Sequence, residues 1–440
     1  MEPCEAKEQL MYGSGSRGLG TTWALVVVIA LTGCGGSEEA PDAGGGLSDG
    51  GGAGGPDAGT DAGPTTSDAG IDAGVDRCGD VICSASDRCH VSTCDPATGL
   101  CVEDDAPDGT VCADSDVCTE VSTCATGVCV AGGPVTDGTL CPCGECSAGA
   151  CGLRVLGPTG AAPGTATPIA FAIDGTNAVI GNSYGGVTDE GSITTLPLAG
   201  GSPTAIATTF TGYPVLTVVG GTVYYTRGAE VWSVPVDGSA APTSLYVGTG
   251  DHFTNITSDG AQLYLTDGSG GGVYGLPFTG GTPDPIATAE ASPRDIVTDG
   301  TQLYWINASD GSIRAIPIGS GPPVTLTAGT APRALAVDAD AIYWTEPSGE
   351  VMRLTLATNM LTTIATGEAD PLAIMRFGDR VYWTNYNGGV EGDIRSAPAV
   401  GGTVETVAGR PFAPNALAHD GTCIYILHAG NGSVSSAPAH

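Results

Sequence analysis

Cationic side chains are scarce in this sequence of 440 residues. It holds 14 lysines and arginines against 48 aspartates and glutamates, which gives a formal net charge of −34. Lys7 is the only lysine, so every later cationic side chain is an arginine. A chain this acidic, without a basic stripe, repels the phosphates of nucleic acids. We therefore expect no nucleic-acid partner.

Helical patterns and catalytic motifs are also missing. Charged residues make up only 14% of the chain, whereas glycine occurs 71 times, and this balance favours short strands and many turns. No Walker loop or zinc-protease helix is present, and no Gly-x-Ser-x-Gly string precedes a helical pattern, as a nucleophile elbow requires. The sequence therefore predicts an all-β fold and favours a binding module over an enzyme. We assign no catalytic residue, no cofactor and no metal site.

Only one long apolar run occurs, Trp23–Leu31, and it is too short to span a bilayer as a helix. Arg17 precedes this run, as expected for a signal peptide over residues 1–33. The run ends in Leu31-Thr-Gly-Cys34, which resembles a bacterial lipobox. This resemblance implies cleavage before Cys34 and lipidation of Cys34, with acyl chains that anchor the protein in a membrane. An ordinary secretory signal with a coincidental cysteine is the alternative.

Residues 34–77 consist mainly of Gly, Asp, Ala and Pro, with repeated Asp-Ala-Gly. Because almost nothing apolar can be buried here, the segment cannot offset the entropy lost on ordering. We expect a disordered, self-repelling linker. Calcium binding by the Asp-Gly pairs is the alternative, although their spacing is irregular and no terminal Glu closes a binding loop.

Residues 78–151 are dense in cysteine and poor in large apolar side chains. Two four-cysteine repeats and a third, degenerate copy comprise Cys83, Cys89, Cys94, Cys101, Cys112, Cys118, Cys124, Cys129, Cys141, Cys143, Cys146 and Cys151. Two bridges per repeat is the simplest disulfide arrangement, and three pairings per repeat stay open. The repeats resemble the cysteine-rich stalk modules of bacterial envelope proteins. The alternative is a zinc site, since Cys143 and Cys146 form a Cys-x2-Cys pair.

Two further cysteines, Cys78 and Cys423, lie outside these repeats. A bridge between them would fasten the cysteine-rich module to the last part of the chain. A buried free thiol at Cys423 is the alternative. In either case the density of cysteines indicates an oxidising compartment.

The remaining segment, 152–440, repeats one pattern seven times. Each copy places Asp-Gly or an equivalent turn between an apolar run and an aromatic run, as in Ser258–Tyr264. Equivalent positions lie about 39–45 residues apart, which is the period of a propeller blade. Asp-Gly between apolar runs is a strong hairpin signal. We predict a seven-bladed β-propeller; the alternative is six-bladed, with a divergent end copy.

The seventh copy ends at His440 before a fourth strand. A spare apolar run, residues 152–157, precedes the first copy. We predict that this run supplies the outer strand of the last blade, which closes the ring and covers its exposed edges.

Three copies carry related tetrapeptides: Tyr264-Leu-Thr-Asp267, Tyr343-Trp-Thr-Glu346 and Tyr382-Trp-Thr-Asn385. They resemble the YWTD motif of low-density-lipoprotein-receptor propellers, and the whole segment also resembles NHL-type and virginiamycin-lyase-type propellers. The motif implies a propeller fold, but YWTD propellers have six blades and the fourth-position Asp is mostly replaced here. Family partners are therefore not carried over. We predict that Trp305, Trp344 and Trp383, at equivalent places, pack between blades.

Propeller ligands usually bind at the mouth of the central channel, near the starts of the first strands. Arg294 and Arg333 follow equivalent prolines in neighbouring copies. We predict that they form an anion-binding patch with Asn255 and Asn415, because guanidinium groups suit carboxylates and phosphates. The alternative is a solvated rim in which the arginines pair with nearby acids such as Asp295.

Histidine is rare, with five residues in the chain. His419 and His428 flank one hairpin, and we interpret them as ordinary loop histidines. The alternative is a catalytic or metal pair, in which the two would approach each other across the hairpin.

The segments together predict a lipid-anchored, monomeric protein of the cell envelope, at the outer membrane and facing the periplasm or the surface. Its propeller would be a binding or scaffold module for a protein or glycan ligand. The alternative is a propeller enzyme, a lyase or hydrolase, that acts on a small molecule at the channel mouth.

Overall fold

The computed structural model describes residues 78, 81–112, 117–148, 150–160, 167–184, 190–248, 253–319, 321–328, 331–387, 391–409 and 413–439. These residues form strands and turns without any α-helix, so none of their segments is a helix that could cross a bilayer. The predicted signal peptide, the lipidation of Cys34 and the linker lie outside the described residues. The described residues divide into two compact units, one that ends at Val135 and one that begins at Thr136.

The described part of the larger unit contains seven four-stranded antiparallel sheets, one for each sequence copy. The first two hold β10 (Thr167–Ile173), β11 (Asn177–Tyr184), β12 (Glu190–Pro197) and β13 (Thr204–Thr211), then β14 (Leu216–Val219), β15 (Thr222–Arg227), β16 (Glu230–Pro235) and β17 (Thr243–Val247). The third and fourth hold β18 (Phe253–Ser258), β19 (Gln262–Asp267), β20 (Gly272–Pro277) and β21 (Asp284–Ala287), then β22 (Pro293–Thr298), β23 (Gln302–Asn307), β24 (Ser312–Pro317) and β25 (Val324–Thr327). This sequence of four-stranded meanders is a β-propeller, as predicted.

The remaining three sheets follow the same plan. The fifth and sixth hold β26 (Ala334–Val337), β27 (Ala341–Thr345), β28 (Val351–Thr355) and β29 (Met360–Ala365), then β30 (Pro371–Phe377), β31 (Arg380–Asn385), β32 (Asp393–Pro398) and β33 (Glu405–Gly409). The last holds β34 (Pro414–His419), β35 (Cys423–His428), β36 (Ser433–Pro438) and β9 (Arg154–Pro158).

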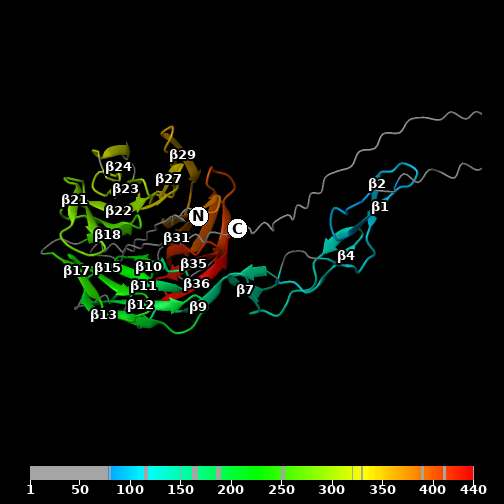
Figure 1. The fold of residues 1–440 in the computed structure, drawn as a ribbon, viewed down its shortest axis with the longest axis horizontal. Helices are drawn as coiled ribbons and strands as arrows, with labels where there is room; N and C mark the ends of the chain where they lie inside the picture. Colours follow the sequence, from blue (N-terminus) through cyan, green and yellow to red (C-terminus); the bar gives the residue numbers. More distant parts are fainter. Residues whose placement is uncertain are drawn as a thin grey trace, which may run out of the picture. The chain divides into compact units, whose positions relative to one another are not determined.

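The sheets form a closed ring (Figure 1). The first strand of each sheet packs against the first strand of the next, and β34 packs against β10. In the last sheet β9 pairs with β36, with Arg154 opposite Ser436 and Pro158 opposite Ser433. The prediction that residues 152–157 supply the missing outer strand is therefore confirmed. Because the first and last strands share one sheet, the ring is joined by backbone hydrogen bonds from both ends of the propeller sequence.

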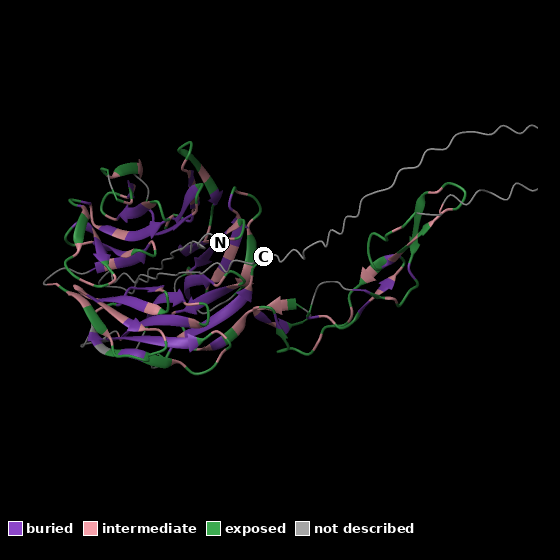
Figure 2. Cartoon of the chain, in the orientation of Figure 1, coloured by how far each residue is buried: buried purple, intermediate pink, exposed green. Residues whose placement is uncertain are grey.

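Burial decreases from the first strand of each sheet to the fourth (Figure 2). All residues of β34 are buried, whereas no residue of β17 is. Trp305, Trp344 and Trp383 are fully buried, in apolar clusters that join neighbouring sheets. Their predicted packing between blades is confirmed.

Four of the hairpin turns are closed by the same pair of interactions. The turn aspartate accepts backbone N–H groups with one oxygen and, with the other, the hydroxyl of the tyrosine five residues later, at 2.7–3.0 Å. The pairs are Asp259 with Tyr264, Asp299 with Tyr304, Asp338 with Tyr343, and Asp420 with Tyr425. The recurring aspartate and tyrosine of the sequence pattern thus fix the turn that joins the first two strands.

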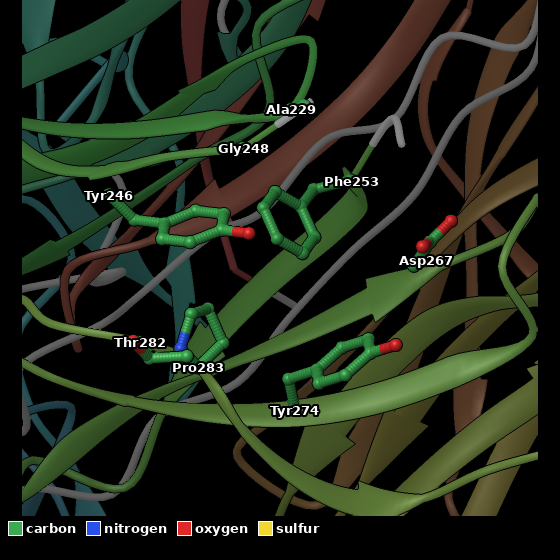
Figure 3. A pocket seen from close by; sticks show the side chains of 8 residues that line it. All are labelled: Ala229, Tyr246, Gly248, Phe253, Asp267, Tyr274, Thr282 and Pro283. Atoms are coloured by element: carbon green, nitrogen blue, oxygen red, sulfur yellow. The ribbon is translucent and has the colours of Figure 1, made fainter. Parts of the chain in front are cut away.

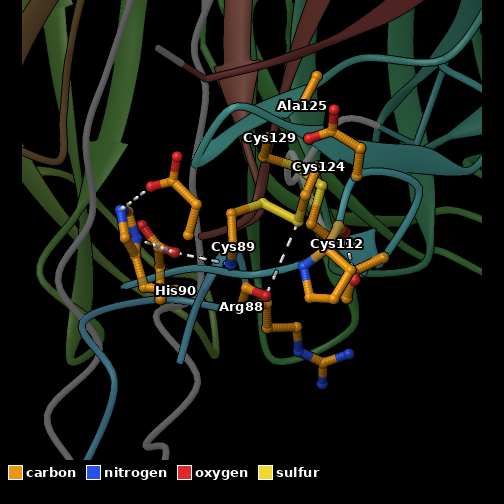
Figure 4. The surroundings of a disulfide bond; sticks show 12 residues. Arg88, Cys89, His90, Cys112, Cys124, Ala125 and Cys129 are labelled. Carbon is orange, nitrogen blue, oxygen red and sulfur yellow. Dashed lines mark hydrogen bonds and ion pairs between the residues drawn. A yellow bond between two sulfur atoms is a disulfide. The ribbon is translucent and has the colours of Figure 1, made fainter. Parts of the chain in front are cut away.

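The smaller unit is held by disulfides around short strands: β1 (His90–Cys94), β2 (Cys101–Asp105), β3 (Val111–Cys112), β4 (Ser122–Ala125) and β5 (Val128–Val130). Its pairs are Cys78–Cys94, Cys83–Cys101, Cys89–Cys124 and Cys112–Cys129. The expectation of two bridges inside each repeat is wrong, because Cys89 of the first repeat pairs with Cys124 of the second (Figure 4). Cys89, Cys112 and Cys124 form a shared buried cluster, so the bridge lets two repeats with few apolar side chains share one core.

The third cysteine repeat belongs to the propeller unit. Its strands β6 (Leu140–Cys141), β7 (Gly144–Ser147) and β8 (Ala150–Gly152) form a small sheet that precedes β9 directly. Cys423 pairs with Cys143, so the predicted bridge from Cys423 to Cys78 is wrong. The reason is the pairing of β9 with β36, which brings the chain before β9 beside the last sheet. The compact unit therefore begins at Thr136, earlier than the boundary expected at residue 152.

Every cysteine that the structure describes is in a disulfide, including Cys118 and Cys146. A second bridge in the third repeat joins Cys141 to Cys151. The sulfur of Cys143 is bonded to Cys423 and is not a thiolate ligand, which removes the Cys-x2-Cys zinc alternative.

Candidate functional site

The predicted mouth residues lie where the first strand of each sheet begins, and most of these strands start with a β-bulge. The register shifts lie at Pro168/Ala170, Phe253/Asn255, Arg294/Ile296, Pro371/Ile374 and Pro414/Ala416. A bulge frees one residue from the ladder and turns its side chain aside. Thr254 Oγ1 donates to Pro293 O at 3.0 Å, in the next sheet. These side chains therefore link neighbouring sheets around the axis.

The structure brings Arg294 and Arg333 together. Arg294 is the second residue of β22, and Arg333 lies immediately before β26; both are partly buried. Burial lowers the pKa of Arg294, the Asp295 carboxylate opposes this effect, and the charge of Arg333 lowers the pKa further. Arg333 Nη1 lies 2.5 Å from Asp370 Oδ1, in the turn before β30. Two cationic groups of neighbouring sheets thus share one small area with the carboxylate of a third sheet.

Asp295 is fully buried and has a left-handed backbone with φ of 51°. Its Oδ2 accepts a hydrogen bond from Leu335 N of the next sheet at 3.0 Å, while its Oδ1 is buried without a hydrogen-bond partner. Burial raises the pKa of Asp295 well above its usual range, against the opposing effects of Arg294 and the Leu335 N–H. Asp295 is therefore an internal link between sheets, and the acid that pairs with Arg333 is Asp370, which is partly buried.

The two asparagines of the predicted patch are buried. Asn415 Nδ2 donates to Pro168 O at 3.0 Å, across the seam where the ring closes. Asn255 Oδ1 accepts from Ile256 N at 2.5 Å. The structure thus places the arginines together near the strand starts and gives both asparagines bonds within the protein. Anion binding by Arg294, Arg333, Asn255 and Asn415 stays a prediction.

His419 and His428 do not approach each other, which removes the alternative of a catalytic or metal pair across the hairpin. In the antiparallel register His428 is opposite Pro414 and His419 is opposite Ile424, which places the two at opposite ends of the strands. Burial lowers the pKa of each histidine to about 4. The His419 ring stacks on Phe377 with centroids 4.3 Å apart, and His428 Nε2 lies 2.9 Å from Ser435 Oγ. Both are neutral side chains that pack inside the propeller.

A repeated carboxylate cluster was not found from the sequence. Glu290 Oε2 accepts hydrogen bonds from Trp305 Nε1 at 3.1 Å and Asn307 Nδ2 at 2.8 Å, and Glu290 Oε1 lies 3.6 Å from Arg314 Nη2. Two sheets further on, Glu368 accepts from Trp383 and Asn385 and lies 3.6 Å from Arg395 Nε. The available signal was spacing, since each glutamate precedes its tryptophan by 15 residues and its asparagine by 17.

The comparisons with known proteins support the fold. No protein-family model matches the chain, and no curated protein matches it. A catalytically inactive virginiamycin B lyase from Staphylococcus aureus, solved with quinupristin, is similar over 66% of this chain and 99% of the lyase, with 14% identity and a TM-score of 0.54. A streptogramin B lyase is similar over 64% of this chain and 96% of its own, with 14% identity and a TM-score of 0.51.

Nidogen in its laminin complex is more distant. It covers 48% of this chain and 88% of its own at 18% identity, and its TM-score of 0.40 carries no argument. At identities this low, the similarity to the two lyases shows a shared β-propeller fold and nothing about activity.

Proposed function

We propose that the protein is a lipid-anchored, monomeric component of the cell envelope whose propeller is a non-enzymatic binding or scaffold module for a protein or a glycan. The disulfides indicate an oxidising, extracytoplasmic compartment. The lipobox resemblance at Cys34 supports the anchor. A flexible linker over residues 34–77 would reach about 35–40 Å on average and separate the folded units from the membrane.

The observation that carries this proposal is the double fastening of the ring where it closes. β9 completes the last sheet, and the disulfide between Cys143 and Cys423 joins the segment before β9 to β35. A propeller fixed in this way holds its surface loops on a rigid frame, which suits recognition of a large ligand. We take Arg294 and Arg333 as the candidate contact, because arginines are few in this acidic chain and guanidinium groups pair well with acidic ligands.

Capture of partners from envelope extracts with the immobilised full chain tests this function. A fragment that starts at residue 152 would leave Cys423 without Cys143, so the full chain is the appropriate bait. We expect one reproducible protein or glycan partner, which is lost when Arg294→Ala is combined with Arg333→Ala. The matched control is Arg353→Ala, in the third strand of the fifth sheet. Equal capture by wild type and the double variant would reject the arginines as the contact.

The second candidate is a lyase or hydrolase that acts on a small molecule at the channel mouth. The observation in its favour is the structural similarity that spans 99% of virginiamycin B lyase. The burial of His419 and His428 weighs against a histidine base among the described residues of the propeller. Because that lyase was solved with quinupristin, incubation of the chain with quinupristin and mass spectrometry of the products tests this candidate directly. Conversion supports an enzyme, and recovery of intact quinupristin counts against lyase activity of that kind.

A further inference from the structure

A pocket lies at the seam between the second and third sheets, and its lining includes neither Arg294 nor Arg333. It holds about 430 Å³ of empty space, including the part open to solvent. Tyr246 of β17, Phe253 of β18, Tyr274 of β20 and Asp267 of β19 line it (Figure 3). The pocket lined by these four side chains is called the aromatic pocket below.

The three rings of the aromatic pocket stand at steep angles to one another. The centroids of Tyr246 and Phe253 are 6.0 Å apart with planes at 58°, and those of Phe253 and Tyr274 are 6.4 Å apart at 78°. Rings at such angles do not stack into a closed layer. They form separate walls around the space between them, as the close-up shows (Figure 3).

Two glycines leave the space that the rings of Tyr274 and Tyr246 occupy. A Cβ atom on Gly272 would lie 2.4 Å from the ring of Tyr274, and a Cβ on Gly248 would lie 2.8 Å from the ring of Tyr246. At both glycine positions a residue with a side chain would collide with the ring, so only glycine fits. The rings therefore lie directly over backbone, and this contact holds them as walls of the pocket.

The fourth wall carries a negative charge. Asp267 is 1% exposed, and its Oδ1 accepts hydrogen bonds from Ser269 N at 3.0 Å, Ser269 Oγ at 2.9 Å and Gly270 N at 2.8 Å. These bonds fix the position of the carboxylate. Among the residues that the structure describes, no arginine, lysine or histidine forms an ion pair with it. Asp267 is thus a buried carboxylate without a cationic partner from the described chain.

Equivalent positions in other sheets supply their own cation. In the third sheet Tyr274 lies opposite Leu265 in the strand register. At the same register position, the fourth sheet has Arg314 opposite Trp305 and the sixth has Arg395 opposite Trp383. The ring of Tyr274 therefore occupies the position of an arginine in those two sheets. Arg314 lies 3.6 Å from Glu290 and Arg395 lies 3.6 Å from Glu368. In the third sheet an aromatic ring stands in place of this arginine, and Asp267 occupies the register position of Asn307 and Asn385.

The rings of Phe253 and Tyr246 also differ from the residues at equivalent positions of other sheets. By register, Phe253 stands where the fourth and sixth sheets have Pro293 and Pro371. Tyr246, opposite Val231, stands where other sheets have Ala287 and Ala365. Large rings thus replace small residues at one seam. The change creates a lined pocket where the equivalent seams hold an internal ion pair.

We propose that the aromatic pocket binds an alkylammonium cation, of the quaternary ammonium class, whose charge lies between the rings and beside the Asp267 carboxylate. The faces of aromatic rings attract cations, and several rings around one space are the arrangement that recognises methylated ammonium groups. The net charge of −34 adds a general attraction for cations. This site is independent of the proposed function, since its ligand needs no macromolecular partner.

Calorimetric titration of the purified full chain with choline tests the proposal. The control ligand is 3,3-dimethyl-1-butanol, which has the same shape without the charge. We expect choline to bind about tenfold more tightly than the alcohol, and Asp267→Asn and Tyr274→Ala each to weaken choline about tenfold. Asp267→Asn keeps an oxygen for the bonds from Ser269 and Gly270, so it removes the charge without removing the turn. Tyr213→Ala, at a tyrosine that is 41% exposed and does not line the pocket, should bind choline as wild type does.

Equal affinity for choline and the alcohol would overturn the proposal, as would unchanged choline binding in Asp267→Asn. Thermal midpoints within a few degrees of wild type identify the variants as folded. Phosphatidylcholine vesicles separate two sources of the same group. Binding to vesicles that Asp267→Asn abolishes supports a lipid headgroup as the ligand, and binding of free choline alone supports a soluble cation.

Discussion

Removal of the disulfide between Cys143 and Cys423 should destabilise the propeller unit strongly, because this bond closes a very long loop. The two cysteines are 280 residues apart, whereas Cys141 and Cys151, in the same repeat, are 10 apart. A disulfide restricts the unfolded chain by an amount that grows with the logarithm of loop length. The chain-entropy relation gives about 5.6 kcal/mol for the long loop and about 2.7 kcal/mol for the short one.

The matched comparison is the double variant Cys143→Ser with Cys423→Ser against Cys141→Ser with Cys151→Ser. Each variant loses one disulfide and gains two serines, so loop length is the main difference between them. Guanidinium unfolding followed by tryptophan fluorescence measures the loss, since Trp305, Trp344 and Trp383 are fully buried in the propeller. We expect the free energy of unfolding to fall about 3 kcal/mol further for the long-loop variant. Equal losses, or a larger loss from the short loop, would refute the loop-entropy argument.

Three further predictions concern the propeller interior. Folding lowers the pKa of His419 and of His428 from 6.5 to about 4, so the unfolded state binds protons before the folded state does as the pH falls. The free energy of unfolding should therefore drop between pH 6.5 and 4, by about 2 kcal/mol per histidine at pH 5. Urea midpoints measure this drop, and His428→Gln should halve it. Glu290→Ala leaves the Trp305 indole N–H buried without its acceptor and should cost about 1–3 kcal/mol in the same assay, with exposed Glu405→Ala as the control that stays within about 0.5 kcal/mol. Leu156→Ala, at a buried residue of β9, should cost about 2–4 kcal/mol, and an unchanged midpoint would contradict the role of β9 in ring closure.

The ring could be predicted from the sequence because its information is local and repeated. The turn aspartate and the tyrosine five residues later recur together, and the structure bonds each pair directly. Closure by residues 152–157 followed from counting strands, since the last copy has three and one apolar run was left over. Both inferences needed only the period and the rule that exposed sheet edges are covered.

Disulfide pairing could not be predicted in the same way. The spacing of cysteines repeats within each module, but a disulfide joins residues whose Cβ atoms meet in the fold, and spacing does not record this. Cys89 and Cys124 meet because two small repeats share one buried cluster. Cys143 meets Cys423 because β9 returns to β36, a contact between distant parts of the chain.

The candidate site was predictable only in part. The alignment of the sequence copies predicted that Arg294 lies beside Arg333. The structure agrees, because the positive charge of Arg333 lowers the pKa of Arg294. The partner of Arg333 was missed because Asp370 lies in a turn between sheets, where the copies do not align. The alternative of a pair of His419 and His428 could have been dropped from the sequence alone, since two strands that run antiparallel from one tight turn place their C-terminal ends at opposite ends of the hairpin.

The repeat itself offers a way to separate packing from recognition. Residues that recur in several copies, such as the turn aspartates, have the same structural partner in each sheet. A residue that departs from the pattern while the backbone register stays the same is not required by the blade. Tyr246, Phe253 and Tyr274 depart together at one seam, and Arg294 and Arg333 depart together at the strand starts. Coordinated departures on a conserved frame change the surface without changing the fold, so these two places are where a ligand should be sought first.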